Sequence, residues 1–328
     1  MKIAAFTSFT GSYLPNARVL AHSVKAVHPE WDFFALFNDR TPPDIKWEDE
    51  PFHEVVFADW LPINRPWMRW AYDYSVVEFC TATKGAMSEF LFDVYGYDAV
   101  VYLDPDVFVF SRFDKILDMM SRGTGDVFLT PHLTDPEDDD DSYAIWSHEM
   151  AALKHGTFNL GFFVIANRPL GRRYLRWWTE RLLDHSHIDF EKGIFTDQKW
   201  CNLAPYMFDG ITVLTDRVYN VATWNTKNRK IGQNNNDAWT VNGQPLIFYH
   251  FSGFGNNFEW ADGELEKFAA GDSFLLKIWN FYKNEYKKNA LETPAPPWHW
   301  GVDRNGHRIT AEMRKTARST TNLDPFSM

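Results

Sequence analysis

The sequence predicts an α/β fold built on a parallel sheet with helices on both faces. Two observations indicate this class. Patterns typical of strands and helices alternate along the chain with short links, which is how the strands of a parallel sheet are connected. Several of the predicted strands are near-continuous apolar runs, as expected of strands that are covered on both faces. At 328 residues the chain is long enough for one large domain of this kind.

The predicted elements follow this alternation in order. Short apolar runs predict strands at residues 2–9, 31–38, 53–57, 100–110, 126–131, 158–166, 212–214 and 246–252. Apolar side chains at three- and four-residue spacing predict a first helix that follows the turn at 10–16 and ends at Val27. The same spacing predicts four further helices at 69–93, 112–120, 170–185 and 275–286. Each predicted helix except the closing one at 275–286 leads towards a further strand, so the alternation extends through most of the chain.

Two segments differ from this pattern. Residues 135–141 are mostly acidic, which predicts a solvated loop, although a flexible lid over an acceptor is conceivable. From Ala290 onward three prolines predict an irregular tail that wraps around the body. Because no internal repeat and no clear linker occurs, we expect a single domain over residues 1–290, with residues 291–328 packing on it as a C-terminal tail.

The composition restricts the classes of ligand. The formal net charge of −11 argues against a nucleic-acid groove, and it would repel an anionic substrate unless a cation or a local Lys or Arg offsets it. Aromatic residues make up 17% of the chain, more than a core requires, and they also suit stacking against sugars. Trp177 and Trp178, however, belong with Tyr174, Arg181 and Leu182 to a set of residues at helical spacing, and we expect these two tryptophans in the core. The composition is therefore compatible with a carbohydrate ligand.

The cysteines and the N-terminus bear on the compartment. Cys80 and Cys201 are the two cysteines, and both lie in apolar helical contexts, so we expect reduced core residues in a cytoplasmic protein. No stretch approaches about 20 apolar residues, and the N-terminus enters a strand without a signal-peptide pattern. We therefore expect no transmembrane segment, and any membrane contact would be peripheral.

The strand predicted at 100–110 contains a pair of acidic residues. Asp104 and Asp106 are two residues apart, so in extended chain they point the same way. Pro105 between them lacks an N–H group and stops ladder pairing there, which places the acids at a strand end. Two carboxylates so close repel each other unless they share a cation or a proton. The pair is therefore solvated, hydrogen-bonded or a metal site, and an ordinary turn after a core strand is the alternative.

Four further stretches carry polar groups in suggestive positions. His250 ends a late apolar strand, and with two carboxylates it would form a site that suits Mn²⁺ better than Ca²⁺, although a lone histidine is more often packed in a core. Asn159 lies inside an apolar strand and must find partners in the protein or in a ligand. Thr196 is expected to cap a helix that starts near Asp197. Lys84 could face a diphosphate, or it could simply be solvated.

Taken in order, these motifs resemble those of the GT-A fold glycosyltransferases. The resemblance is strongest to the retaining family of glycogenin and the bacterial lipopolysaccharide galactosyltransferases, and to uncharacterised bacterial glycosyltransferases of polysaccharide clusters. It covers about residues 1–260, and it rests on the colinear order of the following stretches: Phe6-Thr7-Ser8, Leu14 to Ala21, Lys84, Asp104-Pro105-Asp106, Phe158 to Gly161, Asp197-Gln198 and His250 to Gly253.

The resemblance implies a mixed, mostly parallel GT-A sheet and a role for each motif. Asp104, Asp106 and His250 would hold Mn²⁺ or Mg²⁺ against the diphosphate of a nucleotide-sugar, with UDP the favoured nucleotide. The other implied donor-site residues are Thr7 and Ser8 for the base and ribose, Lys84 for phosphate or donor-sugar oxygens, Gly253 for close backbone approach to the donor, Asn159 for sugar hydroxyls, and Asp197 and Gln198 beside the anomeric carbon.

The implied activity is the transfer of a hexose-type sugar, with retention, to a glycan, lipid-linked or protein acceptor. A cytoplasmic polysaccharide pathway, peripheral at the inner face of the membrane, would fit. The chain departs from the lipopolysaccharide-type members, which carry Lys-Pro-Trp soon after the His-x-x-Gly motif, whereas Gly253 is followed here by residues 254–260 without that sequence. Arg229 or Lys230 could supply the missing phosphate contact.

Other functions stay open. An inverting enzyme with Asp197 or Glu149 as base is not excluded by the spacing. A catalytically decayed carbohydrate-binding protein on the same fold would explain the aromatic excess and the missing Lys-Pro-Trp. A metal-dependent hydrolase or a nucleotidyltransferase that acts on a sugar phosphate would also use an Asp-x-Asp pair.

Overall fold

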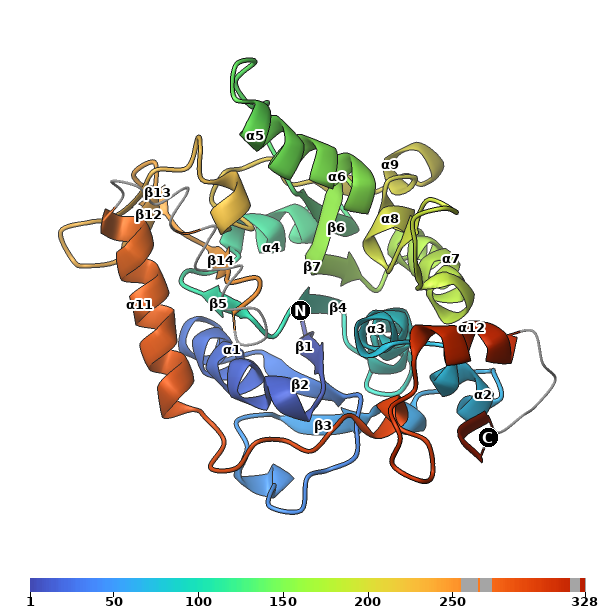
Figure 1. The fold of residues 1–328 in the computed structure, drawn as a ribbon. Coiled ribbons are helices and arrows are strands. Elements are labelled where there is room, and N and C mark those ends of the chain that lie inside the picture. Colours follow the sequence, from blue (N-terminus) through green and yellow to red (C-terminus); the bar gives the residue numbers. More distant parts are fainter. Residues whose placement is uncertain (255–264, 266–272, 319–324, 328) are drawn as a thin grey trace.

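The computed structural model describes residues 1–254, 265, 273–318 and 325–327. A seven-stranded sheet lies at its centre (Figure 1). From one edge to the other its strands are β10 (Ile211–Val213), β6 (Val127–Pro131), β7 (Phe158–Ala166), β4 (Ala99–Leu103), β1 (Ile3–Phe9), β2 (Asp32–Phe37) and β3 (Glu54–Phe57). Strand β7 runs antiparallel to both neighbours, and the other pairs are parallel. The predicted mixed, mostly parallel sheet is confirmed.

Apolar residues on both faces of the sheet explain why its strands read as continuous apolar runs. In β1 every residue is buried. Ala4 and Phe6 belong to the core cluster that includes α3 (Val76–Asp93) and α7 (Pro169–His185). Ile3 and Ala5 belong to the cluster on the other face, under α1 (Leu14–Val27) and α4 (Asp114–Ser121). Successive side chains of a strand point to opposite faces, so a sheet covered by helices on both sides needs apolar residues at every position.

Two predicted elements are each divided in the structure. The helix predicted at 69–93 is wrong as a single element, because α2 (Trp67–Tyr72) ends before α3 begins. Ser75 precedes α3 and forms a capping box with Glu78, whose carboxylate accepts the Ser75 N–H at 2.7 Å. The strand predicted at 100–110 consists of β4 and the separate β5 (Val107–Val109), with Asp104, Pro105 and Asp106 between them.

Strand β5 leaves the main sheet and pairs antiparallel with β14 (Phe248–His250). The other short elements are β8 (Ile188–Asp189), β9 (Ile194–Phe195), β11 (Ile231–Gln233), β12 (Trp239–Val241), β13 (Gln244–Pro245), α5 (Ser142–Ala144), α6 (Met150–His155), α8 (Gln198–Cys201) and α9 (Ala204–Met207). A π-helical turn, Ile145–Glu149, joins α5 to α6. Of these elements, α5, α6, the π-helical turn, α8, β9 and β14 carry residues that line one cavity together with Ser8 of β1 and with Asp104, which follows β4.

The C-terminal part adds two helices, α11 (Ser273–Lys288) and α12 (Ala311–Arg318). The second is an ordered element in the tail that was predicted to be irregular. It lies beside α2 (Figure 1), and Trp300, Ile309, Ala317 and Phe326 pack in one cluster with Trp70 and Tyr72. The buried guanidinium group of Arg314 donates to the backbone carbonyls of Tyr72 and Trp300. The division of the chain at residue 290 stays a prediction.

Two expectations about the chain as a whole can be compared with the described residues. Cys80 and Cys201 are both free, as predicted, and Cys201 is buried against the hydroxyl of Tyr174. Within residues 1–254, 265, 273–318 and 325–327, no helix is both long and apolar enough to cross a bilayer.

Candidate functional site

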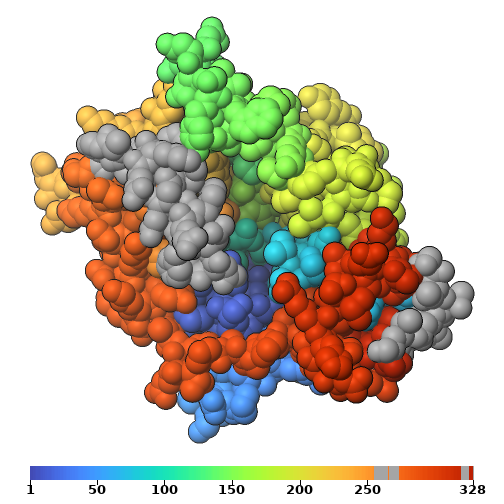
Figure 2. Space-filling view, viewed as in Figure 1, coloured from blue at the N-terminus to red at the C-terminus, as the bar shows by residue number. Residues whose placement is uncertain are grey.

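A large cavity opens at the carboxyl edge of the sheet, where ligands bind in open α/β folds. Its volume is about 1020 Å³, and it lies within the hollow at the centre of Figure 2, between the green segment around α6 and the cyan α3. Because β7 is antiparallel, its first residues lie at the same edge as the last residues of β4 and β1. The predicted site residues that line the cavity are Ser8, Lys84, Asp104, Asp106, Asn159, Asp197, Gln198, His250 and Gly253.

Thr7 is not among the residues that line this cavity. It is fully buried in β1, and its hydroxyl has no hydrogen-bond partner among the described residues. Ser8, its neighbour, does line the cavity, and its hydroxyl donates to the carbonyl of Cys80 at 2.7 Å. The structure therefore brings Ser8, but not Thr7, to the cavity, and the role of Ser8 towards a base and ribose stays a prediction.

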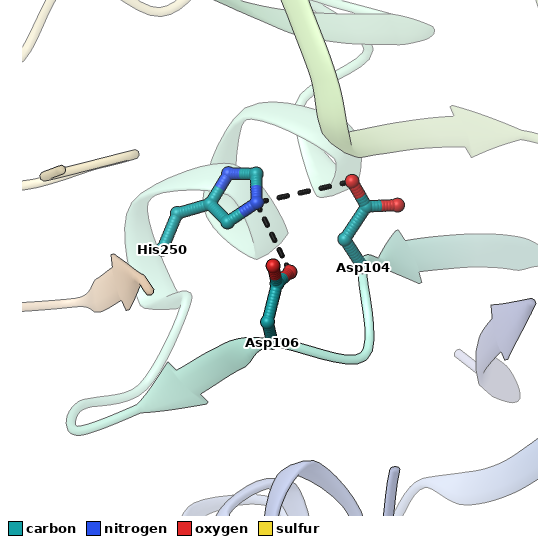
Figure 3. Close-up of side chains that lie close together, drawn as sticks. All are labelled: Asp104, Asp106 and His250. Carbon is teal, nitrogen blue, oxygen red and sulfur yellow. Dashed lines mark ion pairs between the residues drawn. The ribbon is translucent and has the colours of Figure 1, made fainter. Parts of the chain in front are cut away.

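Asp104, Asp106 and His250 form a cluster that could hold a metal ion. One ligand atom from each lies within 4.8 Å of the others, and Figure 3 shows the imidazole ring facing both carboxylates. The Nε2 atom of His250 is 3.1 Å from Asp106 Oδ1 and 3.9 Å from Asp104 Oδ2. The pairing of β5 with β14 sets this arrangement, because His250 lies opposite Val107 and the N–H of Phe251 donates to the Asp106 carbonyl at 2.8 Å.

Asn159 orients the histidine of this cluster. Its Oδ1 atom is 3.2 Å from Nδ1 of His250, so an Nδ1–H group donates to the amide oxygen and Nε2 is left facing the carboxylates. Burial works to lower the pKa of the imidazole, but Asp106 and Asp104 outweigh it and raise that pKa above its ordinary value. Asn159 thus finds a partner inside the protein, and its predicted contact with sugar hydroxyls stays a prediction.

Gly161 leaves the space in which this histidine lies. A Cβ atom at Gly161 would be 2.5 Å from Cε1 of His250 and 2.8 Å from Oδ1 of Asn159. We expect Gly161→Ala to displace the imidazole and to weaken Mn²⁺ binding roughly tenfold or more, as measured by isothermal titration calorimetry. Gly232→Ala is the matched control, since a Cβ atom at that strand position meets only Thr240 Oγ1 at 3.4 Å. Equal Mn²⁺ affinity in the two folded variants would contradict the orienting role of this contact.

Lys84 is buried in an ion-paired cluster, so its alternative prediction as a solvated lysine is wrong. Its Nζ atom lies 2.8 Å from Asp197 Oδ2 and 3.4 Å from Asp104 Oδ1, and it donates to the Leu160 carbonyl at 3.0 Å. Burial opposes the charge of the ammonium group, but Asp104 and Asp197 outweigh burial and raise its pKa. The hydroxyl of Tyr102 donates to Asp104 Oδ1 at 2.5 Å. One carboxylate of the candidate metal cluster is therefore shared with a second buried charge network.

Asp197 and Gln198 are held at the cavity by the start of α8. The prediction that Thr196 caps this helix is wrong, because Asp197 occupies the N-cap position and Thr196 has a left-handed backbone with φ 45°. The backbone carbonyl of Asp197 accepts the indole N–H of Trp178 at 3.2 Å. The side-chain amide of Gln198 donates to the carbonyl of His155 at 3.1 Å, which ties α8 to α6.

Arg229 and Lys230, which were suggested to supply the phosphate contact of the missing Lys-Pro-Trp, do not line the cavity. Gly253 does line it, with a left-handed φ of 83° that favours glycine, but residues 255–260 lie outside the described residues. The buried Arg229 donates to the carbonyls of Arg217 and Asn225, and neither Arg229 nor Lys230 lines the cavity. The structure therefore does not support these two residues as the missing phosphate contact.

Glu149 also lies outside the main cavity. Its carboxylate accepts the N–H of Glu137 at 2.7 Å, and it lines a separate depression. Glu137 itself is buried and pairs with His148 at 2.8 Å and with Lys227 at 3.5 Å. The acidic run at 135–141 is therefore only partly the solvated loop that was predicted, because one of its carboxylates is anchored inside the protein.

Cavity residues that were missed in the sequence include His132, Trp146 and Trp224. His132 contacts the Asn159 side chain at 3.3 Å, and burial lowers the pKa of its imidazole to about 4. The indole ring of Trp224 lies 5.6 Å from the His250 ring, and its Nε1 atom is buried without a hydrogen-bond partner among the described residues. None of the three belongs to a recognisable motif, so only the fold reveals them.

No family model matches the chain. Two proteins from Bacillus subtilis strain 168 are similar to it in part of their sequence. YfnD, an uncharacterised protein, is 30% identical over 242 residues, which cover 72% of this chain and 72% of YfnD. YfnF, also uncharacterised, is 26% identical over 164 residues, which cover 48% of this chain and 50% of YfnF.

Solved structures of glycosyltransferases align with this chain in a comparison of backbone structures. The galactosyltransferase LgtC, in complex with donor and acceptor sugar analogues, matches with a TM-score of 0.48 and 16% identity over 90% of this chain and 98% of LgtC. The glycosyltransferase GlyE of Streptococcus pneumoniae matches with a TM-score of 0.45 and 14% identity over 90% and 66% of the two chains. Mouse xyloside xylosyltransferase 1 matches with a TM-score of 0.43 and 15% identity over 77% and 98%.

Proposed function

We propose that this chain, which belongs to the same protein family as YfnD of Bacillus subtilis, is a metal-dependent glycosyltransferase that uses a nucleotide-sugar donor. The observation that carries the proposal is the cluster of Asp104, Asp106 and His250 inside the cavity at the carboxyl edge of the sheet. The cavity is at the upper end of the size range of pockets that enclose drug-sized ligands, so a nucleotide-sugar fits its volume.

The donor atoms of the cluster suit a divalent cation. Two carboxylates and one imidazole are ligands that Mn²⁺ accepts, and the Nδ1 contact of His250 with Asn159 is the kind of outer contact that orients a ligating histidine. Mg²⁺ is the alternative ion. A cation bound there would offset the negative charge that develops on the departing diphosphate. It would also resolve the conflict between an anionic donor and a chain with a net charge of −11.

The other cavity residues divide into two groups in this proposal. Ser8 at the end of β1 would face the nucleoside, for which we propose uridine, and Gly253 allows the backbone to approach the diphosphate closely. Asn159, Asp197 and Gln198 line the same cavity and would contact the hexose. In this arrangement Lys84 acts mainly by holding Asp197 and Asp104 in place, because its ammonium group already pairs with both.

We propose that the sugar is transferred with retention. Of the two residues considered as a base for inversion, Glu149 lies outside the cavity. The two carboxylate oxygens of the other, Asp197, already contact Lys84 Nζ at 2.8 Å and the Thr196 hydroxyl at 3.1 Å, which leaves this buried side chain poorly placed to accept a proton from an acceptor. Because both cysteines are free, we also place this activity in the cytoplasm.

A donor screen tests the proposal. The protein is incubated with Mn²⁺ and, in turn, a UDP-, GDP-, CMP- or dTDP-sugar, and slow donor hydrolysis is measured by chromatography of the released nucleotide. We expect one nucleotide class to be hydrolysed, most rapidly UDP-sugars. The matching nucleoside diphosphate and Mn²⁺ should together raise the melting temperature, and EDTA should remove both effects. Pyrophosphate as the product would instead identify a nucleotidyltransferase, and sugar binding without any nucleotide effect would identify a binding protein.

A further inference from the structure

One wall of the cavity is formed by exposed apolar side chains. Tyr143, Trp146 and Met150 lie on the segment of residues 142–155, which comprises α5, the π-helical turn and α6, and all three line the cavity. Trp146 is 69% exposed. Val76 and Val77, the exposed first residues of α3, line the same cavity. Large apolar side chains gathered at the mouth of a cavity are a common feature of binding sites.

The segment 142–155 is held in place partly by polar contacts. Buried His148, which also borders the cavity, pairs with buried Glu137, and Glu149 accepts the N–H of Glu137, while Ala144 is the buried apolar residue of the segment. Its apolar side chains at positions 143, 146 and 150 face the cavity and remain exposed. A helix folded for stability alone buries its apolar face. Here polar contacts of His148 and Glu149 help to hold the segment in place, while the indole of Trp146 stays exposed at the cavity.

The π-helical turn lies within the same segment. It covers Ile145–Glu149 and therefore includes Trp146. Such turns are rare, are less favourable than α-helix, and occur often at functional sites because they redirect side chains. The turn and the buried polar pair are independent observations, and both concern the part of the segment that presents Trp146 to the cavity.

The charges around the cavity indicate which kind of ligand this wall accepts. Three carboxylates, Asp104, Asp106 and Asp197, lie in the same cavity as Trp146. The lysines among the lining residues are Lys84, which is already ion-paired, and Lys154, which lies over the ring of Phe190. The negative charges of the three carboxylates and of a bound donor diphosphate exceed the positive charges of the two lysines and a divalent cation, so an anionic acceptor is disfavoured. A neutral saccharide can instead stack the apolar face of its ring on an indole.

We propose that Trp146 is a stacking platform for a neutral saccharide acceptor, and this inference rests on the proposed function. The wall belongs to the same cavity as Asp197 and the metal cluster, so its occupant is a molecule that takes part in the reaction. A hydroxyl oxygen of the acceptor forms the new bond to the anomeric carbon of the donor. The bond from that carbon to the diphosphate oxygen breaks, and the hydroxyl proton leaves with the diphosphate.

The test separates the acceptor step from the donor step. Wild type, Trp146→Ala and Trp146→Phe are assayed with the active donor and Mn²⁺, first without acceptor and then with a panel of methyl glycosides and neutral oligosaccharides. Trp146→Ala should raise the KM for the neutral acceptor about tenfold, a larger change than it causes in the rate of donor hydrolysis, while Trp146→Phe should retain most of the affinity. Leu153→Ala is the control, because Leu153 is exposed on the same segment but does not line the cavity.

Further arms of the experiment can overturn the inference. Glucuronides accepted in preference to neutral glycosides would contradict it, and so would octyl glycosides accepted where methyl glycosides are not, since that result points to an apolar carrier. Equal acceptor KM values for Trp146→Ala and Leu153→Ala would also contradict it. Saturation-transfer NMR measures binding of the neutral saccharides without turnover. If no saccharide of the panel gives a saturation-transfer signal in the presence of nucleoside diphosphate and Mn²⁺, the inference is refuted. Absence of donor hydrolysis in wild type would instead refute the proposed function itself.

Discussion

Asp106→Asn is expected to reduce sugar transfer roughly 100-fold or more and to abolish the rise in melting temperature given by Mn²⁺ with a nucleoside diphosphate. The substitution removes one of the two carboxylate ligands of the three-residue cluster and leaves the size of the side chain almost unchanged. The backbone carbonyl of Asp106, which accepts the N–H of Phe251, is not altered, so β5 and β14 should still pair. The measurements are donor hydrolysis and thermal unfolding, each with and without Mn²⁺.

The control for this variant is Asp209→Asn, which removes the same charge from an exposed site outside the cavity. It should behave as wild type in both measurements. A thermal shift of normal size in Asp106→Asn would show that the cluster does not hold the cation, even if transfer were lost.

Lys84→Met is expected to destabilise the protein by about 3–5 kcal/mol, because it leaves a buried carboxylate without its partner. The side chains of Lys84 and Asp197 are each 3% exposed, so water cannot replace the lost ion pair. Unfolding in urea, followed by circular dichroism, measures the change in the free energy of unfolding.

The double variant Lys84→Met with Asp197→Leu tests the cause of that loss. Removing both charges relieves the unpaired carboxylate, so the double variant should be more stable than Lys84→Met alone. A double variant that loses the sum of the two single effects would indicate that the residues act independently, contrary to their 2.8 Å contact.

Much of the fold was predictable because its signals are local. The strand predicted at 158–166 coincides with β7, and the helix predicted at 170–185 differs from α7 by one residue. Both contain long apolar patterns of the appropriate period, and such patterns are decided by neighbouring residues. The break between α2 and α3 was missed even though Ser75 and Glu78 form a recognisable capping pattern, because apolar spacing continues across it.

The candidate site was predictable only in part. The Asp-x-Asp pair stands out locally, and the order of the motifs along the chain pointed to His250, which the structure brings to the pair through the pairing of β5 and β14. The ion pairs of Lys84 depend on Asp104 and Asp197 from two other elements, so its burial could not be predicted from its own helix. Trp146 and Trp224 come from segments without a periodic pattern, and their positions are set by tertiary contacts alone.

The C-terminal segment bears on when the cavity can form during protein synthesis. The indole of Trp298 donates to the carbonyl of Asn38 at 2.8 Å, and the Asn38 side chain in turn donates to Ser8 at the cavity edge. The N–H of His299 donates to Asp39 at 2.9 Å. Domains fold as units while the ribosome releases the chain from the N-terminus. The first strands therefore emerge long before the residues that brace their ends, and the part of the cavity edge around Ser8 is braced only when translation has passed residue 299.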